Sequence, residues 1–411
     1  MAAQGDLDAQ LKPLLDWLGR HFNAHRFLWF LALASFLVAW NRGLDLLYGL
    51  LALVLALLAI SWLLPWLAIR GIRVERQQSG AAQAGKTLRL EYRVSSRKPA
   101  YHLTLHETLP CRVNAAPCLT SLPAIRREIR FTREQPCDRR GVFTVHSIRL
   151  GCGWPFGLVH LERVRATPPC QLVVMPRTFK IEAFPALRSD IPAMDGYNQT
   201  ARPDINSEFA GVREYRFGDS LKHIHWSASA RHQTLIVREY ESHDRPHLLV
   251  VIDGRPESEI GDAPMSTFEQ AVTIAASLIE YAVEQQIGLH LVVGGLNPLE
   301  LSVPPGARDP YNYLEPLAWV KADGGPDYAQ LVAQARERFG TVNALVTLRN
   351  EGERAPLPPI DTGHLDILFQ EESYLYPVRR YAEGWQPAGP DHQILWVNRN
   401  SDLEELFGHD Q

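Results

Sequence analysis

The hydrophobic pattern divides the chain into three stretches with different periods. Two continuous apolar runs, Phe27 to Trp40 and Leu46 to Ile69, come first, and short alternating segments follow up to about residue 180. From residue 247 onward, short apolar runs alternate with segments of helical period. The pattern therefore predicts a multidomain protein with membrane helices, an antiparallel β domain and an α/β domain, in that order.

The second apolar run, Leu46 to Ile69, is the stronger candidate for a membrane helix. It carries no charge over about 24 residues, and about 20 are enough to cross a bilayer. The first run is shorter, and only residues 41–45 separate the two, so we interpret residues 27–70 as a transmembrane helical hairpin behind an N-terminal tail, 1–26. A cleaved signal peptide is the alternative, but no small-residue cleavage site follows the first run.

The positions of basic residues predict the orientation of this hairpin. Positive charge near the ends of membrane helices marks the cytoplasmic side. Both outer flanks are basic, whereas the turn holds only Arg42; the flanking residues are Lys12, Arg20, Arg26, Arg70, Arg73 and Arg76. We therefore expect a multi-pass membrane protein whose tail and soluble body are cytoplasmic.

Residues 71–180 predict an antiparallel β-sandwich, immunoglobulin-like in general shape, because short strand-like segments follow one another with Pro, Gly and Asn between them. The expected strands are Leu88–Val94, His102–Leu109, Ile125–Phe131, Val142–Leu150 and Leu172–Met175. All the cysteines fall in this range: Cys111, Cys118, Cys137, Cys152 and Cys170. Their number is odd and they form no paired CxxC units, so we expect reduced thiols.

Residues 203–411 predict the α/β domain, and residues 181–202, rich in Pro and polar residues, a linker into it. The expected strands are His247–Asp253, Gly288–Val293, Asn343–Leu348, Leu365–Phe369 and Gln393–Val397. The expected helices are Ser266–Gln286, Leu314–Val320, Tyr328–Phe339 and Asp402–Phe407, the last capped by Ser401. Strands that alternate with helices imply a parallel sheet covered on both faces.

The densest run of charged and aromatic residues lies between Pro203 and Glu241. A buried arginine or aspartate without a partner costs several kcal/mol, so these charges are expected to pair with one another or to face a partner molecule. The candidate docking residues are Glu208, Arg213, Tyr215, Gly218, Asp219, His225, Trp226, Arg231 and Glu239.

The spacing of these residues resembles the signature of the bacterial family called domain of unknown function 58. The resemblance implies two membrane helices, a β-rich segment and a C-terminal domain similar to von Willebrand factor type A, in the bacterial inner (cytoplasmic) membrane. It also implies a MoxR-type AAA+ ATPase as a partner, sometimes beside a transglutaminase-like membrane protein.

The first strand of a von Willebrand A domain ends in DxSxS, whose aspartate and serines help to hold a divalent cation. The corresponding run here is Asp253-Gly254-Arg255-Pro256-Glu257, in which both serines are replaced. Mg²⁺ needs a near-octahedral set of oxygen ligands, and Arg255 would place a positive charge where the ion should sit. We therefore expect a degenerate metal position, with Asp253 bonded to backbone or paired with an arginine, and no cofactor.

The alternative function is that of a membrane-bound GDSL-type serine hydrolase. Gly218 to Leu221 spells GDSL and Asp361 to His364 spells DxxH, which would give the triad Ser220, His364 and Asp361. The run before Gly218 is too charged for the buried strand that presents such a serine, and we find no GxND block.

The histidines of the same stretch leave a second alternative open. His223 and His225 would share one face of a strand, and with Asp219 or His232 they could form a transition-metal site.

Charge limits the class of partner. The net charge of −4 and the isoelectric point of about 6.4 offer no basic face for nucleic acid. The sequence therefore predicts a membrane-anchored, non-enzymatic scaffold or adaptor whose cytoplasmic α/β domain binds other proteins.

Overall fold

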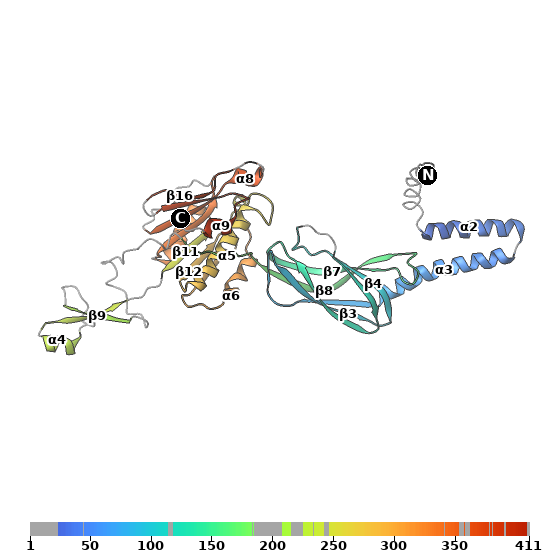
Figure 1. The fold of residues 1–411 in the computed structure, drawn as a ribbon, viewed down its shortest axis with the longest axis horizontal. Helices are drawn as coiled ribbons and strands as arrows, with labels where there is room; N and C mark the ends of the chain where they lie inside the picture. Colours follow the sequence, from blue (N-terminus) through green and yellow to red (C-terminus); the bar gives the residue numbers. More distant parts are fainter. Residues whose placement is uncertain are drawn as a thin grey trace, which may run out of the picture. The chain divides into compact units, whose positions relative to one another are not determined.

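The computed structural model describes residues 24–43, 45–113, 118–182, 184, 208–214, 225–232, 234–241, 246–340, 342–352, 357, 362–377, 379, 381–389 and 392–408. The chain divides into two compact units, Met1–Val174 and Met175–Gln411. Figure 1 follows the elements of each unit along the chain.

The first unit begins with two helices, α2 (Ala24–Arg42) and α3 (Asp45–Arg70). They pack against each other through Ala32 of α2 and Val54 and Leu58 of α3. Among the described residues, α3 is the helix that is long and apolar enough to cross a membrane. Both expected helices are therefore present and one has the length and composition of a span; a second crossing stays a prediction.

The rest of the first unit is made of strands: β1 (Ile72–Gln78), β2 (Ala82–Gln83), β3 (Thr87–Ser96), β4 (Ala100–Glu107), β5 (Cys118–Ile125), β6 (Glu128–Pro136), β7 (Gly141–Cys152) and β8 (Leu161–Met175). They form two sheets, in the orders β1-β3-β6 and β2-β8-β7-β4-β5. The longer strands pair antiparallel. Leu88 and Leu90 of β3 alternate with exposed residues and share one core with Leu103 and Leu105 of β4, so the two sheets bury a common interior.

Most of the expected strands of this unit are present, but one expectation is wrong. The run Ile125–Phe131 is not one strand, because β5 ends at Ile125 and β6 begins at Glu128. The pattern missed β1, β2 and β5. All the cysteines are free, as expected, and Cys118 is the one that is not fully buried.

The core of the first unit holds a polar network. Arg76 of β1 pairs with Glu107 of β4 and donates to the carbonyl of Ser147 at 3.0 Å and to Thr167 Oγ1 at 2.7 Å. The Tyr92 hydroxyl of β3 donates to Glu107 as well. Burial raises the pKa of Tyr92 to about 12, so this phenol stays protonated. The network joins the two sheets, since β1 and β3 belong to one and β4 to the other.

The second unit is built on a sheet of seven strands in the order β13-β12-β11-β14-β15-β17-β16. They are β11 (His247–Ile252), β12 (Gly288–Val293), β13 (Leu299–Val303), β14 (Ala344–Asn350), β15 (Gly363–Phe369), β16 (Gly384–Pro387) and β17 (His392–Val397). The five inner strands pair parallel, whereas β13 and β16 close the edges antiparallel. The expected parallel sheet is confirmed; the polar edge strands escaped the apolar pattern.

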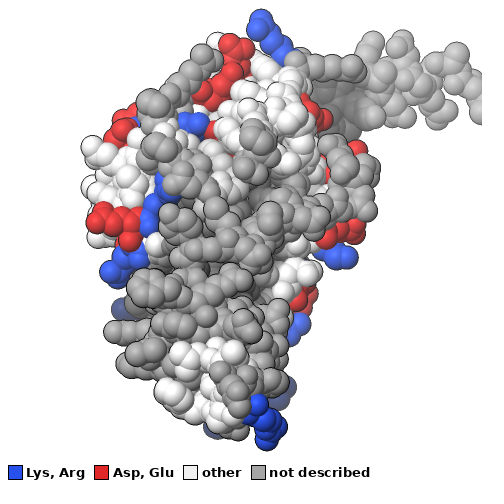
Figure 2. All heavy atoms as spheres, turned by 90° about the vertical axis from the view of Figure 1, so that its left-hand side faces the viewer, with Lys and Arg blue, Asp and Glu red and all other residues white. Residues whose placement is uncertain are grey.

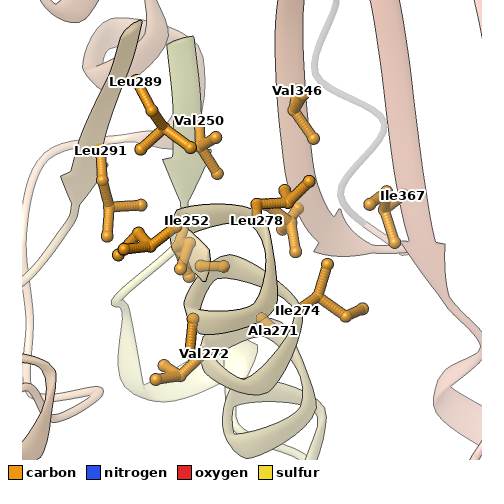
Figure 3. Packing of buried hydrophobic residues seen from close by; sticks show 14 of the residues in the cluster. Val250, Ile252, Ala271, Val272, Ile274, Leu278, Leu289, Leu291, Val346 and Ile367 are labelled. Atoms are coloured by element: carbon orange, nitrogen blue, oxygen red, sulfur yellow. The ribbon is translucent and has the colours of Figure 1, made fainter. Parts of the chain in front are cut away.

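Helices cover both faces of this sheet, as expected. On one face, Ile274 and Leu278 of α5 (Thr267–Glu284) pack against Val250 of β11 (Figure 3). On the other, Tyr328 of α7 (Tyr328–Phe339) packs with Leu249 of the same strand. Continuous apolar strands are the sequence sign of such burial on both faces.

Three details of the second unit correct the expectations. The range Leu314–Val320 is not one helix but α6 (Tyr311–Leu314) and a 3-10 turn that starts at Pro316, which lacks an N–H. At α9 (Leu403–Gly408), Asp402 rather than Ser401 accepts the first backbone N–H groups. Short α8 (Glu371–Leu375) was not expected.

The start of the expected linker, 181–202, is part of the second core. Ile181 and Phe184 are buried there beside Phe179, Glu182 is exposed, and the other linker residues lie outside the described part of the chain. The second unit therefore begins before the α/β pattern becomes visible in the sequence.

Candidate functional site

The order of strands places a candidate site at the carboxyl ends of β11 and β14. From β11 the chain moves outward to β12 on one side and later to β14 on the other, so the direction of winding reverses between them. Open α/β sheets bind ligands in the crevice outside this reversal. Asp253, which follows β11 directly, lies at this position and is 5% exposed.

A guanidinium group occupies the position beside Asp253. Arg255 Nη2 lies 2.8 Å from Asp253 Oδ2, and Arg255 Nε lies 3.1 and 3.2 Å from the two carboxylate oxygens. Arg255 Nη1 also lies 3.0 Å from Asp327 Oδ1, at the start of α7. The expected pairing of Asp253 with an arginine is confirmed, and both oxygens of this carboxylate face a cation that the chain supplies.

The loop that carries Arg255 is held from several sides. The Arg255 backbone N–H donates to Asp253 Oδ1 at 3.0 Å, and Asn350 donates to the carbonyl of Ser258 at 3.1 Å. Gly254 approaches Gly294 so closely that an added Cβ would lie 1.6 Å from its carbonyl oxygen. The loop therefore holds the Asp253–Arg255 ion pair in a fixed geometry. It leaves no room for a side chain at position 254.

A second polar cluster lies inside the same sheet, on the face that α7 covers in part. Arg349 of β14 binds Asp366 of β15, with Nη2 2.6 Å from Oδ2 and Nε 3.1 Å from Oδ1. Thr347 donates to Asp366 Oδ1 at 2.8 Å and lies 2.8 Å from His364 Nε2. Because a carboxylate only accepts, the hydroxyl proton points to Asp366, and His364 Nε2 is the donor to Thr347.

His364 is the member of the expected triad that the structure describes. It is 7% exposed, and its ring stacks on that of His392 with centroids 4.4 Å apart. Burial, and secondarily the nearby His392 and Arg349, lower its pKa to about 4 against the raising effect of Asp366. Its Nε2 is engaged by Thr347, while Ser220 and Asp361 lie outside the described residues. The triad stays a prediction.

The described residues between 203 and 241, the stretch that holds the candidate docking residues, include a small antiparallel pair of strands. β9 (Glu208–Glu214) pairs with β10 (Ile236–Glu241), and α4 (Trp226–His232) lies between them in sequence (Figure 1). Of the candidate residues, Glu208 and Arg213 are on β9 and Glu239 is on β10, opposite Gly211. Tyr215, Gly218 and Asp219 lie outside the described residues, as does His223 of the suggested metal site.

The remaining candidates are near α4. The backbone N–H of His225 donates to the carbonyl of Ile236 at 2.8 Å, which ties the start of α4 to β10. Ser229 fixes the other side, since its hydroxyl accepts from the Ile236 N–H at 2.8 Å. Trp226 is 67% exposed, and Arg231 is also exposed. The structure thus presents an aromatic and a guanidinium group on one short, fixed helix.

Sequence reasoning missed Thr347, Arg349 and Asp366, together with the contribution of Asp327. A signal was present for one of them: Asp366 stands alone inside the apolar run Leu365–Phe369, and a buried acid requires a partner. The identity of that partner depends on strand pairing, which places Thr347 opposite Asp366.

The charges on the visible surface are mixed. On the face that Figure 2 shows, described Lys and Arg side chains are interspersed with Asp and Glu. The described part of this face therefore offers no broad positive field of the kind that attracts nucleic acid.

These features define a protein with an apolar helix of membrane-spanning length, an antiparallel β unit and an α/β unit with an ion pair at the carboxyl end of β11. Residues 211–309 match the family described as "Protein of unknown function DUF58", which confirms the resemblance over this part of the chain. The chain is also similar to the "Uncharacterized protein YeaD" of Bacillus subtilis (strain 168), at 23% identity over 67% of this chain and 69% of that protein.

Two solved structures show slight likeness. The Deinococcus radiodurans RO (RSR) protein is 15% identical with a TM-score of 0.23, over 38% of this chain and 32% of that chain. The Pseudomonas fluorescens alkylpurine DNA glycosylase AlkC, bound to DNA containing an abasic site analog, is 12% identical with a TM-score of 0.16, over 34% and 42%. The chain thus spans less than half of either structure, and neither score carries an argument.

Proposed function

We propose that this protein is a membrane-anchored, non-enzymatic scaffold whose α/β domain binds other proteins, with a MoxR-type AAA+ ATPase as its partner. In this proposal α2 and α3 both cross the bacterial inner membrane and the body is cytoplasmic. The two-sheet unit acts as an immunoglobulin-like spacer. The α/β unit is a von Willebrand A-like domain that has lost its metal, and a transglutaminase-like membrane protein is a further neighbour.

The observation that carries this proposal is the ion pair at the carboxyl end of β11. The Arg255 guanidinium lies 2.8 Å from Asp253, at the place where a domain of this strand order would offer a cation to its ligand. A partner is therefore recognised by protein side chains rather than through a shared ion.

The docking surface in this proposal is α4 with its two flanking strands. Trp226 is 67% exposed and lies on the same short helix as Arg231. Tryptophan and arginine are the residues most enriched among those that dominate binding energy at interfaces. The hydrogen bonds of His225 and Ser229 to Ile236 hold this helix in place before a partner arrives.

Co-purification of the ATPase with the full-length protein tests the proposal. Trp226→Ala is expected to weaken the complex by at least about 2 kcal/mol, roughly 30-fold in Kd. Trp319→Ala is the matched control, because Trp319 is 57% exposed in the same unit but outside the docking stretch. Equal recovery of the ATPase with both variants, or none with the unmodified protein, contradicts the proposal.

A second variant separates the scaffold from the hydrolase. Ser220→Ala is expected to leave both folding and ATPase recovery unchanged. If this variant abolishes function in cells while the protein stays folded and abundant, a serine hydrolase replaces the scaffold as the function.

A further inference from the structure

Three metal-ligating side chains meet on the outer face of the five-stranded sheet of the first unit. His106 lies on β4, Glu162 on β8, and His160 just before β8. Their ligand atoms all lie within 4.8 Å of one another. Glu162 Oε1 is 3.8 Å from His106 Nε2 and 3.8 Å from His160 Nε2. One carboxylate oxygen is therefore equally distant from two imidazole nitrogens.

Strand pairing brings these residues together from distant parts of the chain. Thr104 of β4 lies opposite Gly151 of β7, and Gly151 lies opposite Glu162 of β8. His106 projects to the same face as Thr104, because side chains two apart on a strand share a face. Both are only partly exposed, whereas Leu103 and Leu105 between and beside them point into the core.

Gly151 leaves the space that the cluster occupies. A Cβ at this position would lie 2.4 Å from Thr104 Oγ1 and 2.8 Å from His160 Nε2, both shorter than contacts of real Cβ atoms. A Cβ at Gly153 would likewise lie 3.2 Å from His160 Nδ1. The His160 ring is therefore inserted over two glycines, toward His106 and Glu162.

The polar atoms at the centre of the cluster are not satisfied by one another. A separation of 3.8 Å is too long for a hydrogen bond. His106 Nε2 and Thr104 Oγ1 are both buried atoms without a hydrogen-bond partner. Buried polar atoms without a partner are unusual, and a bound ligand, ion or water is the ordinary explanation. Two of them on one face, beside a carboxylate and a second imidazole, point to a missing central group.

We propose that His106, His160 and Glu162 bind a divalent transition metal ion of the Zn²⁺ type. Zinc binds nitrogen at about 2.0–2.1 Å, so two ligands of a tetrahedral site lie roughly 3.4 Å apart. Glu162 Oε1 lies 3.8 Å from each imidazole Nε2, a few tenths of an ångström farther. Two histidines and a carboxylate are the protein ligands of open zinc sites. The side chains of His160 and Glu162 are 49% and 39% exposed, so the fourth position faces solvent.

Imidazole nitrogens select against other common cations, since Mg²⁺ and Ca²⁺ prefer oxygen ligands. Arg149 Nη1 approaches Glu162 from the other carboxylate oxygen, Oε2, at 3.8 Å and leaves Oε1 to the metal. The competing explanation is a surface cluster in which Arg149 and the histidines simply surround an acid.

The similar group of His364, Asp366 and His392 does not carry the same inference. Its ligand atoms also lie within 4.8 Å of one another. However, Arg349 and Thr347 already bind the Asp366 carboxylate, and Thr347 engages His364 Nε2.

Zinc binding by the full-length protein, purified in detergent and stripped with a chelator, tests the proposal. Equilibrium dialysis gives the number of tightly bound Zn²⁺ equivalents. His106→Ala, His160→Ala and Glu162→Gln are each expected to lose one equivalent, with affinity at this site reduced more than about 100-fold. His146→Ala is the matched control, since it removes an exposed imidazole from β7 of the same sheet and is expected to keep that equivalent. Thiolates are zinc ligands as well, and the chain has free cysteines, so the equivalent lost on substitution is the result that counts.

Gly151→Ala sharpens the test because it keeps all three ligands. Its methyl group displaces His160 and is expected to lower the affinity by about 10- to 100-fold, as other changes in ligand support do. Co²⁺ bound at the same site reports this displacement through its visible absorption. If the three ligand variants bind as many Zn²⁺ equivalents as His146→Ala, the cluster is a surface group of charges and the proposal is wrong.

Discussion

Asp253 in the second unit and Glu162 in the first are both carboxylates with basic neighbours, yet their surroundings differ. Asp253 is 5% exposed and its oxygens lie 2.8–3.2 Å from the Arg255 guanidinium. Glu162 is partly exposed, and its basic neighbours all stay at 3.8 Å. The first carboxylate is saturated by the chain itself, whereas the second is approached but not bound. Residue types alone do not identify a ligand site. What identifies it is the number of ligand atoms, carboxylate oxygens and imidazole nitrogens, that no other group of the chain binds.

Two other buried carboxylates follow the pattern of Asp253. Glu107 pairs with Arg76 in the first core, and Asp366 pairs with Arg349 in the second sheet. In both pairs the arginine also lies within a sheet interior, where its charge is costly unless compensated. Arginine suits this role because its fork binds both oxygens of a carboxylate at once.

The largest effect is expected from Asp366→Ala, which tests whether a saturated cluster is structural. The side chains of Asp366 and Arg349 are 2% and 13% exposed, so the substitution removes the carboxylate from a buried cation. The free energy of unfolding should fall by about 3–5 kcal/mol. Urea unfolding of the full-length protein, followed by tryptophan fluorescence, measures this change.

Glu300→Ala is the control for Asp366→Ala. Glu300 pairs with Arg338 on the surface of the same unit, with exposed fractions of 50% and 71%. Exposed pairs contribute about 0–1 kcal/mol, so the control should unfold almost as the unmodified protein does. Equal loss of stability in both variants would show that the buried pair is not special.

A smaller effect is expected from acid, through His364 in the same cluster. Its pKa is about 4 in the folded state, below the ordinary value of about 6.5, so the unfolded chain binds more protons between these values. The contribution of His364 is therefore complete above about pH 6.5 and is lost as the pH falls toward 4, by roughly 3 kcal/mol at most. Unfolding midpoints at pH 7, 6, 5 and 4 measure the loss, and His364→Gln should flatten this part of the profile. An unchanged profile in that variant means that other groups set the acid sensitivity.

The smallest effect concerns the closed position at Asp253. Arg255→Ala removes the guanidinium but leaves the backbone N–H that donates to Asp253 at 3.0 Å, so we expect a loss of about 2 kcal/mol. Mg²⁺, which prefers oxygen ligands, should leave the Tm of the unmodified protein unchanged, whereas its binding at 100 times Kd would stabilise the protein by about 2.7 kcal/mol. A saturable shift in Tm that Asp253→Ala abolishes would show that Asp253 binds a metal ion, and that it does not differ from Glu162 in the way described above.

The inner strands of the second unit and the helices α5 and α7 were predictable because their patterns are strong and local. Strand β12 and helix α7 have the expected bounds. The ends of β14 and β15 lie within two residues of the expected ends. The edge strands β13 and β16 were not predictable, because both have solvent-exposed residues and lack a continuous apolar run. In addition, β16 is only four residues long. The end of one strand and the start of the next, as around Arg126 between β5 and β6, cannot be located from the apolar pattern alone. They become visible once the partners are known, since β5 pairs with β4 and β6 pairs with β3.

The sites were predictable only where their residues are neighbours in sequence. Asp253 and Arg255 are two positions apart, and the replaced serines already led us to expect that Asp253 bonds to backbone or pairs with an arginine. His106 and Glu162 are brought together by the pairing of β4, β7 and β8. Gly151 leaves space for the His160 ring, which is visible only once this pairing is known. No spacing rule within the sequence describes this kind of site.

The connection between α3 and β1 limits how the first unit moves. Gly71 alone separates Arg70 from Ile72, and Ile69 is part of the core of the β unit. Arg165 also donates to the carbonyl of Ile69 at 3.3 Å. The ends of a flexible linker lie about 5–6 Å times the square root of its residue number apart, whereas a single residue between two packed segments leaves little of this freedom. With α3 in a bilayer, the strands of the first unit tilt together with the helix. The β unit then meets other membrane proteins by diffusion in the plane of the membrane, at a nearly constant distance from the bilayer.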